Sequence, residues 1–160
     1  MTDNASAEVE AGGFYAELAG EFLHHYRRGP RFIAVTGVPR SDPARVADSL
    51  AAALRDAGQR THRISVDGAT GADTFREQTV APFRSEDGVL IADGPELLNS
   101  DFRGFWNFSV WIERDPERSP EWSFISTDDH DELGSARGAA SVLMDDVDFE
   151  RPRRLWADSC

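Results

Sequence analysis

The residues most suited to phosphate chemistry lie in the segment Gly37-Val-Pro-Arg-Ser-Asp-Pro-Ala44. An apolar, β-branched run precedes this segment and a helical pattern follows it, which is the strand, glycine turn and helix order of a phosphate-binding loop. Aligned on Gly37, the pattern G-x-x-x-x-G-K-[ST] requires glycine, lysine and a hydroxyl residue where this chain has Asp42, Pro43 and Ala44. The chain contains no lysine at all, because its 17 basic side chains are all arginine. The groups that bind phosphate oxygens and magnesium are therefore missing.

Asp42 and Pro43 instead form a strong signal for the start of a helix. An aspartate at this position accepts hydrogen bonds from the first free backbone N–H groups, and proline at the first helical position loses no hydrogen bond. The carboxylate of Asp42 would then occupy the helix N-terminus that otherwise attracts a phosphate. A strand, a glycine turn and a capped helix are common in α/β proteins, so this stretch alone does not identify an altered phosphate-binding loop.

Two further carboxylates, Asp67 and Asp93, each follow an apolar strand pattern and precede a glycine. In parallel sheets, ligands bind beyond the carboxyl ends of the strands, so these ends and the segment from Gly37 to Asp42 are expected to meet at one edge. Two carboxylates over one cleft can act as a general base and a metal ligand. They can equally cap turns, as Asp-Gly pairs commonly do, and the sequence leaves both interpretations open.

The elements that must position these residues follow from hydrophobic periodicity. The patterns predict strands over 31–36, 61–66, 88–93, 108–113 and 141–144 and helices over 14–28, 44–57, 72–83 and 95–105. A further helix is predicted around 129–140, within a polar, irregular stretch that begins at 114. Alternating strands and helices predict a three-layer α/β/α fold with a five-stranded, mostly parallel sheet. Residues 1–12 are expected to form a loose tail, and 13–160 a single domain.

Composition excludes several classes of function. The net charge of −12 disfavours binding to nucleic acid and anionic lipid. The absence of a signal peptide and of a membrane-spanning run predicts a cytoplasmic protein. Cys160 is the single cysteine, and His24 and His25 face different ways on a helix, so neither predicts a metal site. We expect no metal and no cofactor.

Four segments together resemble the uridine kinase-like branch of P-loop kinases. Arg63-Ile-Ser-Val-Asp67 is similar to the strand of that family that ends in a substrate-contacting carboxylate. Gly88-Val-Leu-Ile-Ala-Asp-Gly-Pro-Glu-Leu-Leu98 is similar to its third strand and following turn, and Trp106-Asn-Phe-Ser-Val-Trp-Ile112 to its fourth strand. The stretch from Ala140 to Arg154 is similar to its closing strand. The resemblance runs from about residue 31 to 155 and implies the P-loop kinase type of fold.

The chain also departs from that family at residues on which kinase activity depends. The resemblance gives Asp67 the role of the substrate carboxylate, Asp93 that of the acidic end of the third strand, and Gly37 that of the first loop glycine. Of the arginine-bearing lid, Arg114 and Arg118 alone remain. The lysine and the magnesium-binding hydroxyl have no counterpart, so we expect no ordinary ATP-dependent kinase activity.

Three functions stay open on the sequence. The first is a kinase relative without phosphate transfer that binds a small molecule or a protein partner, or forms a homodimer; the ligand-binding candidates are Gly37, Arg40, Ser41, Asp42, Arg114 and Arg118. The second is a repurposed enzyme that uses Asp67, Asp93 or His130 as acid or base, although His130 lies in an acidic stretch typical of a solvated loop. The third is an atypical phosphotransferase in which arginines replace lysine.

Overall fold

The computed structural model describes residues 2–113, 136–145 and 151–155, with side chains from residue 12 onward. Its helical segments are α1 (Thr2–His25), α2 (Pro43–Asp56), α3 (Ala72–Phe75), a π-helical turn (Arg76–Val80), α4 (Ala81–Phe83) and a 3₁₀ turn (Arg103–Phe105). Its strands are β1 (Pro30–Gly37), β2 (Thr61–Ser65), β3 (Gly88–Asp93), β4 (Phe108–Ile112), β5 (Val142–Asp145) and β6 (Arg153–Leu155). The predicted α/β fold with a mostly parallel sheet is confirmed.

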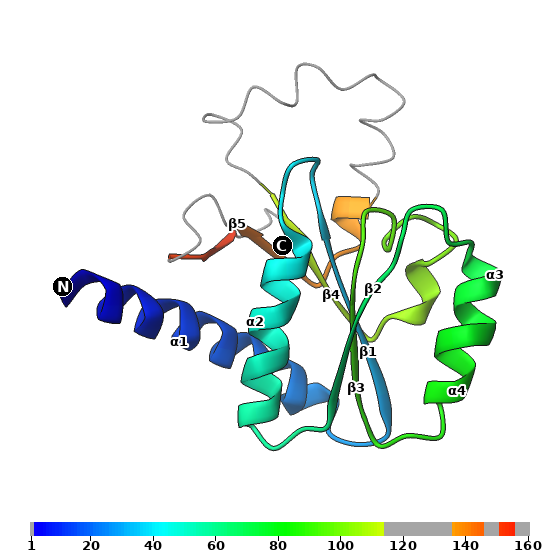
Figure 1. Cartoon of the computed structure of the whole chain (residues 1–160), viewed down its shortest axis with the longest axis horizontal. Coiled ribbons are helices and arrows are strands. Elements are labelled where there is room, and N and C mark those ends of the chain that lie inside the picture. Colours follow the sequence, from blue (N-terminus) through cyan, green and yellow to red (C-terminus); the bar gives the residue numbers. More distant parts are fainter. Residues whose placement is uncertain (1, 114–135, 146–150, 156–160) are drawn as a thin grey trace.

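The strands of the described residues form one sheet in the order β2-β3-β1-β4-β5-β6. All neighbouring pairs are parallel except β5 and β6, which run antiparallel. Parallel pairing brings the carboxyl ends of β1 to β4 to one edge of the sheet. Helices α1 and α2 lie on one side of the sheet and α3 and α4 on the other, as Figure 1 shows.

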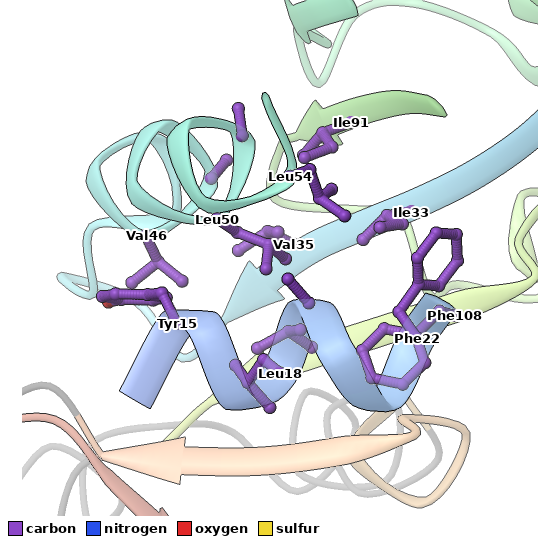
Figure 2. Packing of buried hydrophobic residues seen from close by; sticks show 14 of the residues in the cluster. Tyr15, Leu18, Phe22, Ile33, Val35, Val46, Leu50, Leu54, Ile91 and Phe108 are labelled. Atoms are coloured by element: carbon purple, nitrogen blue, oxygen red, sulfur yellow. The ribbon is translucent and has the colours of Figure 1, made fainter. Parts of the chain in front are cut away.

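Two hydrophobic layers follow from the period-2 alternation of the strands. On the side of α1 and α2, Ile33 and Val35 of β1 pack with Phe22 and Leu50, and all four side chains are fully buried (Figure 2). On the opposite side, Ala34 packs with a second cluster that contains Phe75, Leu90, Leu97 and Trp111. Strand β1 is therefore covered on both faces, as a central parallel strand requires.

Helix α2 has the clearest amphipathic pattern in the chain. Its buried residues, Val46, Ala47, Leu50, Ala51 and Leu54, recur at helical spacing and pack on the sheet. This packing fixes the start of α2, and with it Asp42, beside the carboxyl end of β1.

Three elements differ from the prediction. Helix α1 begins at Thr2, whereas the sequence pattern predicts a helix from residue 14. The stretch from 95 to 105, predicted as a helix, forms turns and the short 3₁₀ segment, although Leu98 and Phe102 are buried at helical spacing. The helix predicted around 129–140 falls largely outside the described residues, of which Ala136 to Gly138 are helical.

The sheet also has a sixth strand where five were predicted. Strand β6 is short and reads Arg-Arg-Leu, so it carries no alternating hydrophobic pattern. Ion pairs hold it in place: Arg153 contacts the buried Asp145 of β5 at 2.6 Å, and Arg154 contacts Glu21 of α1 at 2.6 Å. The strand depends on these long-range contacts, which a local pattern cannot reveal.

The tryptophans that the structure describes, Trp106 and Trp111, pack in or against the second hydrophobic cluster. Trp111 is 1% exposed and belongs to the second hydrophobic cluster, as its position in a buried strand predicts. Trp106 is half-buried, and its Nε1 donates a hydrogen bond to the carbonyl of Leu97 at 2.7 Å. Trp122 and Trp156 lie outside the described residues. No helix within the described ranges combines the length and the apolar character needed to cross a bilayer.

Candidate functional site

The candidate site lies where the ends of β1 and β3 meet. The connection after β1 runs through α2 on one face of the sheet, whereas the connection after β3 packs Leu97 and Leu98 on the other face. Adjacent strands whose connections leave in opposite directions create a crevice at their carboxyl ends, which is where open α/β sheets bind ligands. A cavity of about 340 Å³ is found at this point. Its lining comes from Gly37 to Ser41 and Pro43 after β1 and from Asp93 to Pro95 after β3.

Glycine at position 37 is required by the close approach of β1 to β4. A Cβ atom there would lie 2.5 Å from the carbonyl oxygen of Ile112 and 2.7 Å from Oγ of Ser41. The next residue, Val38, donates its backbone N–H to the same Ile112 carbonyl at 3.0 Å. The first loop glycine is thus explained by packing within the fold.

The loop after Gly37 is a tight turn closed by its own polar groups. Ser41 donates its backbone N–H and its hydroxyl to the carbonyl of Val38, at 3.1 and 2.6 Å. Arg40 has a φ of 71°, in the left-handed region that few residues other than glycine adopt. The turn therefore differs from an open loop whose successive N–H groups converge on a phosphate.

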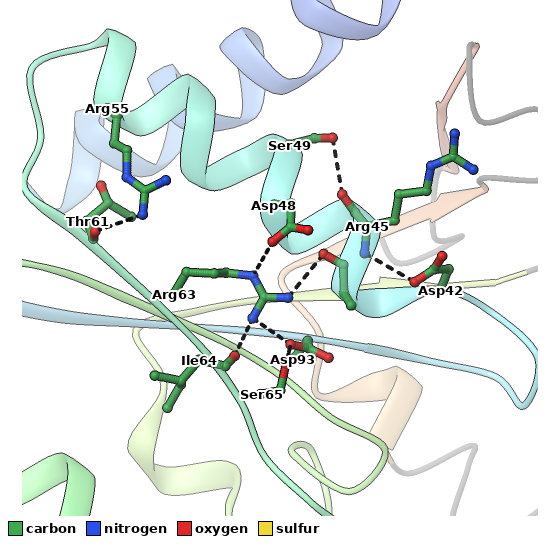
Figure 3. Close-up of polar contacts among 11 residues, drawn as sticks. Asp42, Arg45, Asp48, Ser49, Arg55, Thr61, Arg63, Ile64, Ser65 and Asp93 are labelled. Carbon is green, nitrogen blue, oxygen red and sulfur yellow. Dashed lines mark hydrogen bonds and ion pairs between the residues drawn. The ribbon is translucent and has the colours of Figure 1, made fainter.

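Asp42 caps helix α2, as the sequence predicts. Its carboxylate accepts a hydrogen bond from the backbone N–H of Arg45 at 3.2 Å, and its carbonyl accepts from Val46 at 3.4 Å. Pro43, at the first helical position, has no N–H group to donate. At the N-terminus of α2, Asp42 therefore accepts the N–H groups of Arg45 and Val46, and its contact with Arg45 is drawn in Figure 3.

Asp93 is held in a polar cluster that the sequence analysis did not anticipate. This residue is 9% exposed, and its Oδ1 accepts a hydrogen bond from Oγ of Ser65 at 2.6 Å. The same Oδ1 forms an ion pair with the Arg63 guanidinium at 2.5 Å. Ser65 and Asp93 are register partners in the parallel pair β2–β3, so their side chains share a face of the sheet.

Arg63 connects strand β2 to helix α2. Its guanidinium donates to the carbonyl of Ala44 at 3.1 Å and to the carbonyl of Ile64, and its Nε lies 3.0 Å from a carboxylate oxygen of Asp48. Figure 3 shows the side chain extending from β2 beneath the first turn of α2 to reach Asp93. The guanidinium therefore occupies the space between the start of α2 and the acidic end of β3. It is the main site residue that the sequence reasoning missed.

Asp67 does not join this cluster. It is exposed, its carboxylate accepts the backbone N–H of Ala69 at 2.7 Å, and its carbonyl accepts that of Thr70 at 2.9 Å. It is not among the residues that line the cavity. These contacts are those of a turn-capping aspartate, one of the two interpretations that the sequence left open.

The other predicted candidates divide into two groups. Gly37, Arg40 and Ser41 line the cavity, whereas Arg114, Arg118 and His130 lie outside the described residues. In the part of the chain that the structure describes, no three His, Cys, Asp or Glu side chains are grouped so that they could hold a metal ion.

Comparison with solved structures finds proteins of similar fold. A protein assigned as a possible uridine kinase from Bacillus stearothermophilus superposes with a TM-score of 0.61 at 13% identity, over 81% of this chain and 96% of that one. A protein assigned as a fructose transport system kinase from Silicibacter sp. TM1040 superposes with a TM-score of 0.50 at 16% identity, over 79% and 95% of the two chains. No protein-family model and no curated protein sequence matches the chain. This chain therefore shares the α/β fold of these two solved structures, and at these identities the likeness concerns the fold alone.

Proposed function

We propose that this chain is a kinase-like P-loop protein that has lost ordinary binding of ATP and magnesium and that acts as a binding protein, with a small molecule as its ligand in the cavity between β1 and β3. The observation that carries the proposal is that both charged positions of the ancestral site are filled by side chains of the protein itself. The carboxylate of Asp42 caps the helix that would bind phosphate, and the guanidinium of Arg63 is paired with Asp93.

At the position that would hold the phosphates, the loop offers few free binding groups. In P-loop proteins, backbone N–H groups and a lysine surround the phosphates, and a serine or threonine binds magnesium. Here Pro39 and Pro43 have no N–H group, and the N–H groups of Val38, Ser41 and Arg45 are bonded within the fold. A nucleotide would have to displace these contacts and would meet the Asp42 carboxylate.

At the position that would hold magnesium, the carboxylate already has a charged partner. An aspartate at the end of the strand next to the loop normally helps to hold magnesium. Asp93 is at that position but is ion-paired with Arg63, so a magnesium ion would have to compete with a partly buried guanidinium. Removing one preorganised charged donor from a catalytic site costs roughly 3 to 4 kcal/mol of transition-state stabilisation, and here the lysine and the metal ligand are both absent.

The geometry gives less support to the repurposed enzyme and to the atypical phosphotransferase. Asp93 is committed to Arg63 and Ser65, and Asp67 caps an exposed turn away from the cavity. An arginine on a loop of different shape does not reproduce the compact charge of the lysine.

Isothermal titration calorimetry with ATP and Mg²⁺ tests the proposal. We expect no detectable binding to the native protein under conditions in which a kinase with an intact G-x-x-x-x-G-K-[ST] loop binds. The matched variant is Asp42→Gly with Pro43→Lys and Ala44→Ser, which restores that loop pattern and should gain affinity for ATP if these three residues cause the loss. Micromolar binding of ATP and Mg²⁺ by the native protein would contradict the proposal.

A further inference from the structure

The chain contains three Asp-Gly pairs, and the structure places them in different surroundings. They are Asp67-Gly68 after β2, Asp87-Gly88 at the start of β3 and Asp93-Gly94 at its end. In such a pair, the backbone nitrogen of glycine can attack the carboxyl carbon of aspartate and close a five-membered succinimide ring. Glycine favours the attack because it has no Cβ atom to hinder the approach. The attack also requires a glycine N–H group without a hydrogen-bond partner and room for the backbone to turn.

The sheet closes Asp87-Gly88 to this reaction. Gly88 is buried, and its N–H group donates to the carbonyl of Gly29 at 3.2 Å. The Asp87 carboxylate accepts the N–H group of Gly29 at 2.7 Å in return. The backbone is also crowded, since a Cβ atom at position 88 would lie 2.8 Å from the carbonyl oxygen of Arg60.

The sheet closes Asp93-Gly94 in the same way. Gly94 is buried, and its N–H group donates to the carbonyl of Val35 at 3.3 Å. A Cβ atom at position 94 would lie 2.6 Å from the carbonyl oxygen of Val66, so the backbone has little room to turn. The Asp93 carboxylate is held by its ion pair with Arg63.

Asp67-Gly68 meets the requirements that the other two pairs do not. Both residues are exposed, and among the described residues the Gly68 N–H group has no hydrogen-bond acceptor. A Cβ atom at position 68 would have Pro95 Cγ as its nearest neighbour, at 3.6 Å. Asp67 Oδ1 accepts the N–H group of Ala69 at 2.7 Å, which folds the carboxyl group back over the Gly68 peptide. The same N–H group would stabilise the charge that develops on Oδ1 during the attack.

We infer that Asp67-Gly68 is a modification site at which the chain forms isoaspartate without an enzyme. The Gly68 nitrogen bonds to Cγ of Asp67, and one carboxyl oxygen leaves as water with the amide and carboxyl protons. Water then adds to the main-chain carbonyl of the ring and breaks its bond to the Gly68 nitrogen. The main chain now runs through Cβ and Cγ of residue 67 and is longer by one methylene group. This inference is independent of the proposed function.

Peptide mapping of the full-length protein tests the inference. After incubation at body temperature and neutral pH, trypsin releases Asp67 in the peptide 64–76 and the other two aspartates in 85–103, and electron-transfer fragmentation locates isoaspartate in each. We expect about tenfold or more isoaspartate at residue 67 than at 87 or 93, because the pairs in the sheet must open locally before they react. Equal conversion at the three pairs, or greater conversion at 87 or 93, would overturn the inference.

The same incubation in guanidinium chloride is the control for local sequence. Without the fold, the three pairs should react at similar rates, so the preference for residue 67 should disappear. A preference that persists in the unfolded chain would show that the structure does not select the site. Conversion of the unfolded chain without any conversion of residue 67 in the native protein would also contradict the inference.

Two glycine variants assign the reaction to the Gly68 nitrogen. Gly68→Ala fits the native turn, because its Cβ atom would make an ordinary contact with Pro95, and it should lower the conversion of residue 67 by about tenfold. Gly71→Ala is the matched control in the same connection, since nothing lies within 4 Å of a Cβ atom there, and it should leave the conversion unchanged. Equal conversion in the two variants would overturn the inference.

Discussion

Arg31 is buried and Arg63 is partly buried, and these two arginines of the same sheet make different kinds of contact. Arg31 lies at the amino end of β1, where its guanidinium donates to the carbonyls of Gly29 and Tyr26 at 3.0 and 2.9 Å. Its nearest described acid, Asp87, is exposed and 3.7 Å away. Arg63 lies toward the carboxyl end of β2, and its acidic partner Asp93 is buried and 2.5 Å away.

The difference separates a scaffold contact from a contact within the site. Burial lowers the pKa of Arg31, and the Asp87 carboxylate offsets part of that shift. Its main contacts are backbone carbonyls, so it closes the turn between α1 and β1 at the end of the sheet away from the cavity. Arg63 instead neutralises the one carboxylate that is both buried and at the cavity. The same residue type therefore closes a turn at one end of the sheet and pairs with a carboxylate of the cavity at the other.

The largest effect is expected from separating Arg63 and Asp93. Asp93→Asn leaves the exposed Asp48 as the acidic partner of the Arg63 guanidinium among the described residues, and breaking a buried pair costs about 3 kcal/mol or more of the free energy of unfolding. Urea unfolding measures this loss. Asp73→Asn is the control, because Asp73 is 90% exposed in its pair with Arg76 and should change stability by at most about 0.5 kcal/mol. A loss no greater than that of the control would show that the pair is not a structural contact.

Arg31 should have an intermediate effect. Arg31→Met keeps much of the apolar stem but removes the donors to the Gly29 and Tyr26 carbonyls, which should cost about 2 kcal/mol in urea unfolding. Arg60→Met is the matched control, since the side chain of Arg60 is 72% exposed and its ion pair with Glu86 is a surface contact. Arg31→Met should lower the urea midpoint more than Arg60→Met, because the carbonyls of Gly29 and Tyr26 lose their donor. Equal midpoints for the two variants would show that the contacts of Arg31 contribute little to stability.

The smallest effect is expected at the helix cap. Asp42→Ala removes the acceptor for the Arg45 N–H and should cost about 1 kcal/mol, whereas Asp42→Asn retains a good cap and should be nearly neutral. Equal urea midpoints for the two variants would show that the cap contributes little. Neither change should create ATP binding, because the chain still has no lysine.

Local patterns predicted the parts of the fold that local physics decides. The alternation of β-branched and apolar residues located strands β1 to β5 within one or two residues, and the helical stripe of α2 with Asp42 and Pro43 gave its start. Parallel topology places the ends of β1 and β3 at one edge, and Gly37, Arg40, Ser41 and Asp93 line one cavity there. Asp67 was grouped with them on the same reasoning, yet the direction of its turn keeps it out of the cavity lining.

The sequence by itself determined the order of the elements and the start of α2 at Asp42 and Pro43, because both follow from residues adjacent in the chain. Only the tertiary structure decided that Arg63 would pair with Asp93 and that β6 would join the sheet through Asp145 and Glu21. These contacts join residues far apart in the chain, and strand register and helix packing set their distances.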